Sequence, residues 1–345
     1  MTDQSAPAAG PPSTRRRRRW LRWCILGVVV GLVGVELFSR AYLGLGDPPL
    51  LMSDPEIEYL YRPSQTGHRF GNLIHYNAYS MRSSDFPAHK IDPSELRVLV
   101  IGDSVINGGA QTDQSQVCTE RLGESLSVAL RRKVVVGNIS AQSWGPPNML
   151  AYLRRFGLFD ADVLVIVVAS HDAEDVPTFK PVVGVQRDFP DHKPLTATGE
   201  LVSRYLWPMI LGMTVNDSGP IPVIESNQAA REQGLLALRE MIRLARASGA
   251  RVVVAQHLER TEALGTLRPE HDLIARLASE EGAQVIQLGP AFAASLRSGL
   301  DPYRDIVHPN TVGQRLIGRE LFNALEPMFR NAPASRPLDT RPDRE

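Results

Sequence analysis

Five short, mainly β-branched apolar runs constrain the fold of this sequence more than any other feature. The runs lie at 97–101, 133–136, 163–168, 251–255 and 284–288. They are largely continuous rather than alternating, which is typical of parallel strands covered by helices on both faces. Helical periodicity separates them at about 114–131, 147–157, 228–248 and 270–281, and a last helix is expected over 311–329. The sequence therefore predicts an α/β fold, a three-layer α/β/α sandwich around a five-stranded, mainly parallel sheet with right-handed crossovers.

Two regions stand outside this alternation. Residues 43–95 contain several aromatic side chains and predict a partly extended lead-in segment to the first core strand. Residues 176–227 contain seven prolines and a short helical pattern around 200–211. That segment is too long for an ordinary connection and too small and Pro-rich for a core of its own. We therefore expect a lid-like insert within one domain that spans 96–330.

The N-terminus combines a basic flank with an apolar run. Residues 1–22 form a basic tail that includes five consecutive arginines, Arg15 to Arg19, and residues 23–42 are mostly apolar, interrupted by Glu36. No small-x-small cleavage site follows, so we expect one uncleaved transmembrane helix, a signal anchor, rather than a cleaved peptide. The positive-inside rule places the tail in the cytoplasm. The remaining chain is then extracytoplasmic, in the periplasm or at the cell surface.

Charge and cysteine content argue against two classes of protein, nucleic-acid binders and disulfide-stabilised scaffolds. The formal net charge is zero, but residues 1–40 hold seven arginines against Asp3 and Glu36, so the remaining chain is net acidic. That balance argues against nucleic-acid binding. Cys24 lies in the apolar run and Cys118 in the body, so no disulfide framework is expected. Residues 331–345 have little to bury and predict a disordered tail.

A serine stands where the first core strand ends. Gly102 and Asp103 precede Ser104, and the carboxyl ends of parallel strands are where open α/β sheets place their ligands. Gly, Asp and Ser are also common in turns, so the motif taken alone favours a helix cap over a nucleophile at Ser104. The motif needs support from elsewhere in the chain.

That support follows the last strand. Asp305 and His308 stand three residues apart in a Pro-braced loop that leads into the final helix, at the same expected sheet edge as Ser104. A serine hydroxyl needs a base to become a nucleophile, and the base needs a carboxylate that fixes its tautomer and stabilises the imidazolium. The two motifs together supply all three groups.

The paired motifs resemble those of the SGNH (GDSL-type) hydrolases, whose fold is a flavodoxin-like α/β/α sandwich. The resemblance covers residues 70–329 and implies that Ser104 is the nucleophile, His308 the general base and Asp305 its orienting carboxylate. With the apolar N-terminal segment, the chain resembles an extended, membrane-anchored form of that family. Two residues match the segment that precedes the first motif in extended members, and we expect a structural role for them: Asn77 and Arg82.

The family's oxyanion hole is only partly recognisable. The resemblance implies donation by the Ser104 N–H and by a backbone N–H after the second strand, where spacing from Asn138 selects Ser143 in place of the usual glycine, with Gly145 as the second choice. After the third strand, His171 occupies the position of the usual asparagine, and an imidazole N–H is also a donor. Two other interpretations of this segment remain open. His171 and Asp172 either pair or cap locally, or join the nearby carboxylates in a metal cluster, although a serine mechanism needs neither a metal nor a cofactor.

We therefore expect a membrane-anchored, extracytoplasmic serine esterase that hydrolyses small acyl esters, acetyl esters above all, with glycans as the substrate class suggested by the location. The expected partners are an acylated small molecule or glycan and the membrane, and no nucleic acid. Two alternatives remain open. An O-acyltransferase that modifies an envelope polysaccharide would use the same triad and need a membrane acyl-donor partner, and a catalytically silent envelope binding or assembly protein would use none of it.

Overall fold

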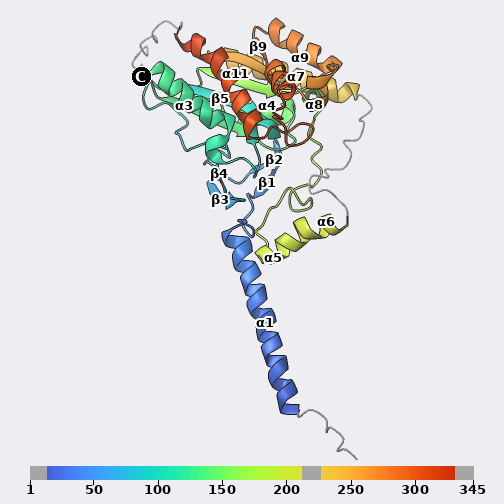
Figure 1. The fold of residues 1–345 in the computed structure, drawn as a ribbon. Coiled ribbons are helices and arrows are strands. Elements are labelled where there is room, and N and C mark those ends of the chain that lie inside the picture. Colours follow the sequence, from blue (N-terminus) through green and yellow to red (C-terminus); the bar gives the residue numbers. More distant parts are fainter. Residues whose placement is uncertain (1–13, 212–226, 331–345) are drawn as a thin grey trace, which may run out of the picture. The chain divides into compact units, whose positions relative to one another are not determined.

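The five predicted strands form one sheet in the computed structural model of the chain (Figure 1). Their order is β6-β5-β7-β8-β9, and every neighbouring pair is parallel. The strands are β5 (Leu96–Gly102), β6 (Val134–Ser140), β7 (Val163–Val168), β8 (Arg251–Gln256) and β9 (Gln284–Gln287). Chain order reverses direction in the sheet between β5 and β7, and such a switch point is where α/β sheets open a crevice at their carboxyl ends.

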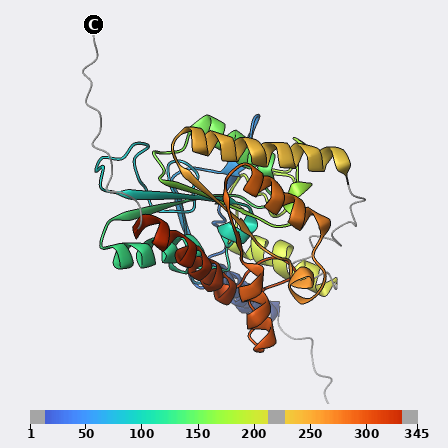
Figure 2. The ribbon, with the colours of Figure 1, turned by 90° about the horizontal axis from the view of Figure 1, so that it is seen from above.

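Helices cover both faces of the sheet, as Figure 2 shows. Successive side chains of β5 point to opposite faces, so Leu99 and Ile101 enter one core and Val98 and Val100 the other, all fully buried. The first core is covered by α4 (Pro146–Phe156), α7 (Gln228–Ala247) and α9 (Pro269–Glu280). The second is covered by α3 (Cys118–Leu130), α10 (Gly289–Arg297) and α11 (Thr311–Arg330). The predicted three-layer sandwich with a parallel five-stranded sheet is confirmed.

The lead-in forms two hairpins rather than one loosely extended segment. β1 (Leu51–Asp54) pairs with β2 (Glu58–Tyr61), and β3 (Gln65–Arg69) pairs with β4 (Asn72–Tyr76), both antiparallel. Phe70 and Gly71 both have positive φ in the turn between β3 and β4, which is the backbone that a two-residue hairpin turn requires. Aromatic residues from both hairpins join the core under α4 and α7, where Tyr61 stacks on Tyr76 at 4.0 Å.

The structure describes residues 14–211 and 227–330. The first 13 residues of the predicted basic tail, residues 212–226 of the predicted insert and the predicted disordered tail at 331–345 lie outside the described residues. Contacts divide the chain into two compact units, one formed by residues up to 47 with 194–216 and the other by 48–193 with the remainder. The boundaries that we predict for the lead-in, main domain and insert remain predictions.

The unit that contains the N-terminal helix is small. Its long helix α1 (Thr14–Ala41) is followed after a wide gap in sequence by α5 (Ala197–Glu200), a π-helical turn η3 (Leu201–Leu206) and α6 (Trp207–Ile210). These last three elements confirm the short helix expected around 200–211. Among the described residues one helix, Arg18–Ala41, has the length and apolar content to cross a membrane, with a mean hydropathy of 2.0 in its most apolar window and its side chains exposed.

Candidate active site

Ser104 begins a short helix at the carboxyl end of the central strand. β5 ends at Gly102, and Asp103 caps the following helix α2 (Ser104–Asn107) by accepting a hydrogen bond of 2.9 Å from the Val105 N–H. A side chain at Gly102 would meet the Val167 carbonyl oxygen at 3.0 Å, so only glycine lets the chain turn this close to β7. The local sequence thus places the Ser104 hydroxyl at the sheet edge, where it is partly accessible.

The loop before α11 brings a histidine to this hydroxyl. His308 Nε2 lies 2.9 Å from Ser104 Oγ, and His308 Nδ1 lies 2.7 Å from Asp305 Oδ2. Asn310 ends the loop by accepting a 2.8 Å bond from the Val312 N–H, which caps α11. With the Nδ1 proton directed at Asp305, Nε2 is the acceptor for the serine hydroxyl. The structure therefore brings the three sequence-predicted residues into one hydrogen-bonded series.

Asp305 is held as a carboxylate. Its Oδ1 accepts hydrogen bonds from the N–H groups of Val307 at 2.9 Å and His308 at 2.8 Å, while its Oδ2 faces the imidazole. Burial would raise the pKa of Asp305, but these hydrogen bonds and the facing imidazole more than reverse that effect and hold the pKa well below its ordinary value. Asp305 therefore stays ionised at any pH at which the fold persists, and can stabilise an imidazolium at His308.

A second histidine, His257, supports the loop that carries His308. His257 follows β8, is fully buried, and places Nε2 at 3.0 Å from the Val307 carbonyl oxygen. Burial lowers the pKa of His257 to about 4, so the ring is neutral and donates its Nε2 proton to that carbonyl. Its ring also packs edge-on against Phe292 at 4.9 Å. His257 is therefore a structural residue that fixes the backbone next to His308.

The loop after β6 carries the two predicted backbone donors, and their surroundings differ. Ser143 adopts a φ of 54°, the left-handed backbone that favours glycine, and its N–H donates to no other described residue. The Gly145 N–H already donates to Asn148 Oδ1 at 3.1 Å. A side chain at Gly145 would clash with the Asp175 carbonyl oxygen, so this glycine serves close backbone packing. The free N–H favours Ser143 over Gly145 as a donor.

The lead-in holds this loop, which sequence reasoning did not anticipate. The Tyr59 hydroxyl donates to the Gln142 carbonyl oxygen at 2.8 Å, and Trp144 Nε1 donates to the Tyr59 carbonyl oxygen at 3.0 Å. Burial and the nearby Glu58 carboxylate raise the pKa of Tyr59, so its hydroxyl keeps its proton and remains a donor. The aromatic content of the lead-in was a signal of packing, but nothing local to Tyr59 identifies its partner more than eighty residues away.

Arg82 orders the loop on the other side of the nucleophile. Its guanidinium is fully buried and donates to the carbonyl oxygens of Asn107 at 2.7 Å, Thr112 at 2.5 Å and Gly109. A buried cation of this kind is tolerated because its N–H groups find carbonyl acceptors. The structural role expected for Arg82 is therefore evident as a clamp on the turn that follows α2.

His171 lies at the end of β7 among carboxylates. Its Nε2 is 3.2 Å from Asp172 Oδ1 and its Nδ1 is 3.0 Å from Glu259 Oε1. Burial would lower the pKa of His171, but the charges of Asp172 and Glu259, with those of Asp175 and Asp103, raise it to about 10. His171 is therefore an imidazolium at neutral pH. Its firmer charged partner is Glu259, whose pKa is lowered, whereas burial raises the pKa of Asp172. The structure thus agrees with one of the two open interpretations, in which His171 and Asp172 pair locally.

The sequence matches a known family over most of the body. Residues 100–316 match the GDSL-like Lipase/Acylhydrolase family. The chain belongs to that family. Its members are ester-hydrolysing serine hydrolases, and the resemblance that the Ser104 and His308 motifs suggested is thereby confirmed. A comparison with curated proteins finds no match.

Solved structures with similar architecture include several members of the same family. One is a lipolytic G-D-S-L protein from Veillonella parvula, with 12% identity, a TM-score of 0.43 and coverage of 66% of this chain and 97% of that one. Another is a mutant of an acetyl-xylooligosaccharide esterase from Geobacillus stearothermophilus, with 13% identity, a TM-score of 0.44 and coverage of 66% and 93%.

The cluster around His171 is where the sequence left a metal interpretation open. Asp103, His171 and Asp172 place possible ligand atoms within 4.8 Å of one another. The two ring nitrogens of His171 face Asp172 and Glu259 as ion pairs. The geometry therefore supports the local-pairing interpretation.

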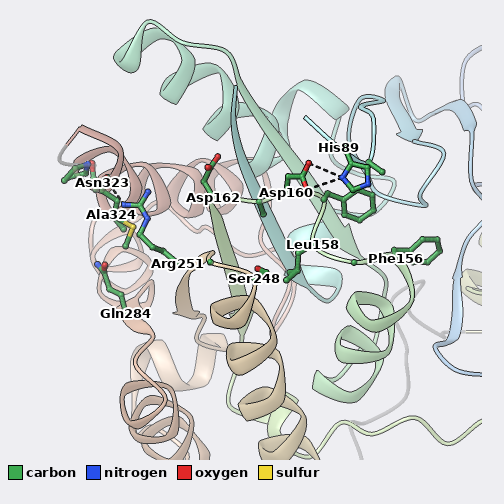
Figure 3. Close-up of a pocket in the computed structure, with 17 residues that line it drawn as sticks. His89, Phe156, Leu158, Asp160, Asp162, Ser248, Arg251, Gln284, Asn323 and Ala324 are labelled. Carbon is green, nitrogen blue, oxygen red and sulfur yellow. Dashed lines mark hydrogen bonds and ion pairs between the residues drawn. The ribbon is translucent and has the colours of Figure 1, made fainter. Parts of the chain in front are cut away.

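A surface pocket lies at the other edge of the sheet (Figure 3). Its lining includes Asp162, directly before β7, and Arg251 and Gln284, the first residues of β8 and β9. These are amino ends of strands, whereas Ser104 follows a carboxyl end. The pocket is therefore separate from the chemistry of the triad.

Proposed function

We propose that this acylhydrolase is a membrane-anchored, extracytoplasmic serine esterase that hydrolyses small acyl esters, with acetyl esters of glycans as its substrates. The observation that carries the proposal is the series from Ser104 Oγ to His308 Nε2 at 2.9 Å and from His308 Nδ1 to Asp305 Oδ2 at 2.7 Å. Both distances fall within the range for a nucleophile, a base and its orienting carboxylate.

The first half of the reaction makes an acyl-enzyme. His308 takes the hydroxyl proton as Ser104 Oγ attacks the ester carbonyl carbon, and Asp305 stabilises the imidazolium. When the tetrahedral intermediate collapses, the bond to the leaving alcohol breaks and His308 gives its proton to that alcohol. The acyl group remains on Ser104.

The oxyanion is held in this proposal by two backbone donors, the Ser104 N–H and the Ser143 N–H. His171 contributes its charge as the third group, since both of its ring nitrogens face carboxylates. Neither backbone N–H donates to another described residue, which leaves both free for a substrate oxygen. The positive charge of His171 adds electrostatic stabilisation where negative charge develops. An imidazolium held by Asp172 and Glu259 supplies that charge through the whole neutral range.

Water completes the cycle. His308 removes a proton from a water molecule that attacks the acyl carbon, the bond to Ser104 Oγ breaks, and the proton returns to Ser104 to release a carboxylic acid. Side-chain exposures of 36% for His308 and 31% for Asp305 show that solvent reaches this side of the site in the described residues.

The membrane half of the proposal rests on the N-terminal helix. Trp20 and Trp23 stand at its beginning and Tyr42 just after its end, and all three are largely exposed. At 1.5 Å per residue, Trp20 and Tyr42 are about 33 Å apart along the axis, close to the roughly 30 Å of a bilayer core. Aromatic residues at both ends are typical of membrane interfaces, and Arg15 to Arg19 favour a cytoplasmic N-terminus. An enzyme exported in this way meets acylated envelope glycans.

The test is turnover by the full-length protein in detergent with p-nitrophenyl acetate and butyrate, with and without oligosaccharide acceptors. We expect Ser104-dependent release of nitrophenol, faster for acetate, with acetic acid as the second product. Acyl transfer to the oligosaccharide in place of acetic acid would favour the acyltransferase alternative. A folded protein with no turnover would favour the silent binding protein.

A further inference from the structure

Glu36 interrupts the apolar run of α1, and its carboxylate has partners from a distant segment. It accepts hydrogen bonds from the N–H groups of Ala197 at 3.0 Å and Thr198 at 2.8 Å, and from the Thr198 hydroxyl at 2.8 Å. Arg40, one turn later, donates to the same carboxylate at 2.6 Å. A carboxylate in a membrane helix is costly unless it is paired, and here the first turn of α5 and Arg40 pair it.

A second connection lies just beyond the end of α1. The Gly46 N–H donates to Glu200 Oε2 at 2.7 Å, and Glu200, at the end of α5, is buried. Gly46 has a positive φ, and a side chain there would lie 2.9 Å from Arg40 Nη1 and 3.3 Å from Ala197 Cβ. The chain therefore passes close to α5 on both sides of the helix end. These contacts fix the helical segment that starts at Ala197 at the level where the apolar run of α1 ends.

The rest of that helical segment exposes large apolar side chains. Pro208 is buried and Ser203 and Arg204 are polar, but most of the exposed side chains between 202 and 211 are large and apolar. These apolar side chains, with their exposed fractions, are Val202 (44%), Leu206 (38%), Trp207 (57%), Met209 (64%), Ile210 (70%) and Leu211 (58%). Single exposed apolar residues are ordinary, but a contiguous group marks an interaction surface.

We propose that residues 201–211 lie in the lipid–water interface of the membrane that α1 crosses, with Trp207, Met209 and Ile210 inserted at the boundary of headgroups and acyl chains. The inference rests on the proposed anchor role of α1. Glu36 lies six residues before Tyr42, which is about 9 Å along the helix axis. A segment bonded to α1 through Glu36 is therefore held near the level at which α1 leaves the hydrocarbon, and tryptophan prefers that region. This half of the predicted insert then serves as a second membrane contact instead of a lid.

The test measures immersion depth at three single nitroxide labels in full-length protein, reconstituted in vesicles of phosphatidylcholine and phosphatidylglycerol. Cys24 is replaced by Ser, and Cys118 is buried and stays unlabelled. The labelled variants are Ile210→Cys for the proposed surface, Leu32→Cys for the span and Leu236→Cys as a matched control on α7, where the native side chain is 52% exposed. Collision with oxygen, which partitions into lipid, is compared with collision with a water-soluble nickel chelate.

We expect oxygen collision to exceed nickel collision several-fold at 210 and more strongly at 32, with the reverse at 236. A label at 210 that behaves like 236 while 32 is deep would overturn the inference and leave the anchor intact. Aqueous behaviour at both 32 and 210 would mean that the anchor itself fails, whereas ester turnover is measured independently. Replacing Glu36→Gln should move the label at 210 toward the aqueous control, and no change in its depth would contradict the tethering role of Glu36.

Discussion

The hydroxyl of Tyr59 donates a 2.8 Å hydrogen bond to the carbonyl oxygen of Gln142, the residue before Ser143. Tyr59 belongs to β2 of the lead-in, and Ser143 to the loop after β6 of the sheet. A segment outside the sandwich thus sets the backbone of a proposed oxyanion donor. The family needs a fixed donor here, because a preorganised N–H stabilises the transition state only when it already faces the developing charge.

Replacing Tyr59→Phe removes this bond and leaves the ring in place. We expect kcat/KM for p-nitrophenyl acetate to fall roughly 5- to 30-fold, since a lost hydrogen bond of about 1–2 kcal/mol would act on the donor geometry. The matched control is Tyr152→Phe, which removes a hydroxyl bonded to the Tyr79 carbonyl oxygen at 2.5 Å. A Tyr59 variant that loses only thermal stability, as the control should, would contradict the positioning role.

Replacing Asp305→Asn tests the orienting carboxylate. The change removes the charge that stabilises an imidazolium at His308 and disturbs its tautomer, so we expect kcat to fall by about 10³- to 10⁴-fold with little change in KM. Steady-state kinetics near pH 8 measure the effect. A loss of less than about tenfold in a folded variant would show that Asp305 does not act on the base.

Replacing His171→Asn separates charge from structure. Because the pKa of His171 is raised from 6.5 to about 10 in the fold, its ion pairs stabilise the protein fully below pH 6.5, and this contribution is lost as pH rises toward 10. We therefore expect the variant to have a lower Tm at about pH 6 and a difference that shrinks by about pH 10. Activity should persist, since the two backbone donors, the N–H groups of Ser104 and Ser143, are unchanged. A Tm difference that grows with pH would contradict the assignment.

Replacing Gly145→Ala tests the close approach of the Ser143 loop to the segment after β7. The added Cβ would clash with the Asp175 carbonyl oxygen, so we expect a loss of about 1–3 kcal/mol in the free energy of unfolding together with lower kcat. Gly123→Ala in α3 is the control, since its Cβ would meet only a Val136 side-chain carbon at 3.3 Å. Equal stability of the two variants by urea denaturation would be inconsistent with the packing described.

The sheet was predictable from sequence because each of its strands is itself a short, continuous apolar run. Runs such as 163–168 are buried on both faces and contain nothing polar, so burial and composition coincide. The hairpins of the lead-in were not predicted, because Gln65–Arg69 is polar and only its pairing with Asn72–Tyr76 makes it a strand. The pairing of Glu36 could not be predicted either, since its partners in α5 are about 160 residues away.

The candidate site likewise contains some residues that the sequence predicts and others whose roles depend on the tertiary structure. Ser104, Asp305 and His308 stand in short motifs that can be recognised from the sequence alone. The proposed donor role of Ser143 depends on a left-handed backbone conformation, with a φ of 54°. A serine in the sequence does not predict that conformation. The raised pKa of His171, about 10, depends on carboxylates that include Glu259, which follows a different strand, and no motif around His171 identifies that partner.

The most direct test of the proposed mechanism is the mass of the intact full-length protein after reaction with a fluorophosphonate, compared for the parent, Ser104→Ala and Ser115→Ala. Ser115 is an exposed serine outside the site and serves as the control. We predict one adduct on the parent and on Ser115→Ala, mapped to Ser104, and none on Ser104→Ala, whose ester turnover falls to background. A folded Ser104→Ala protein that still acquires the adduct and still turns over ester would contradict the assignment of Ser104 as the nucleophile.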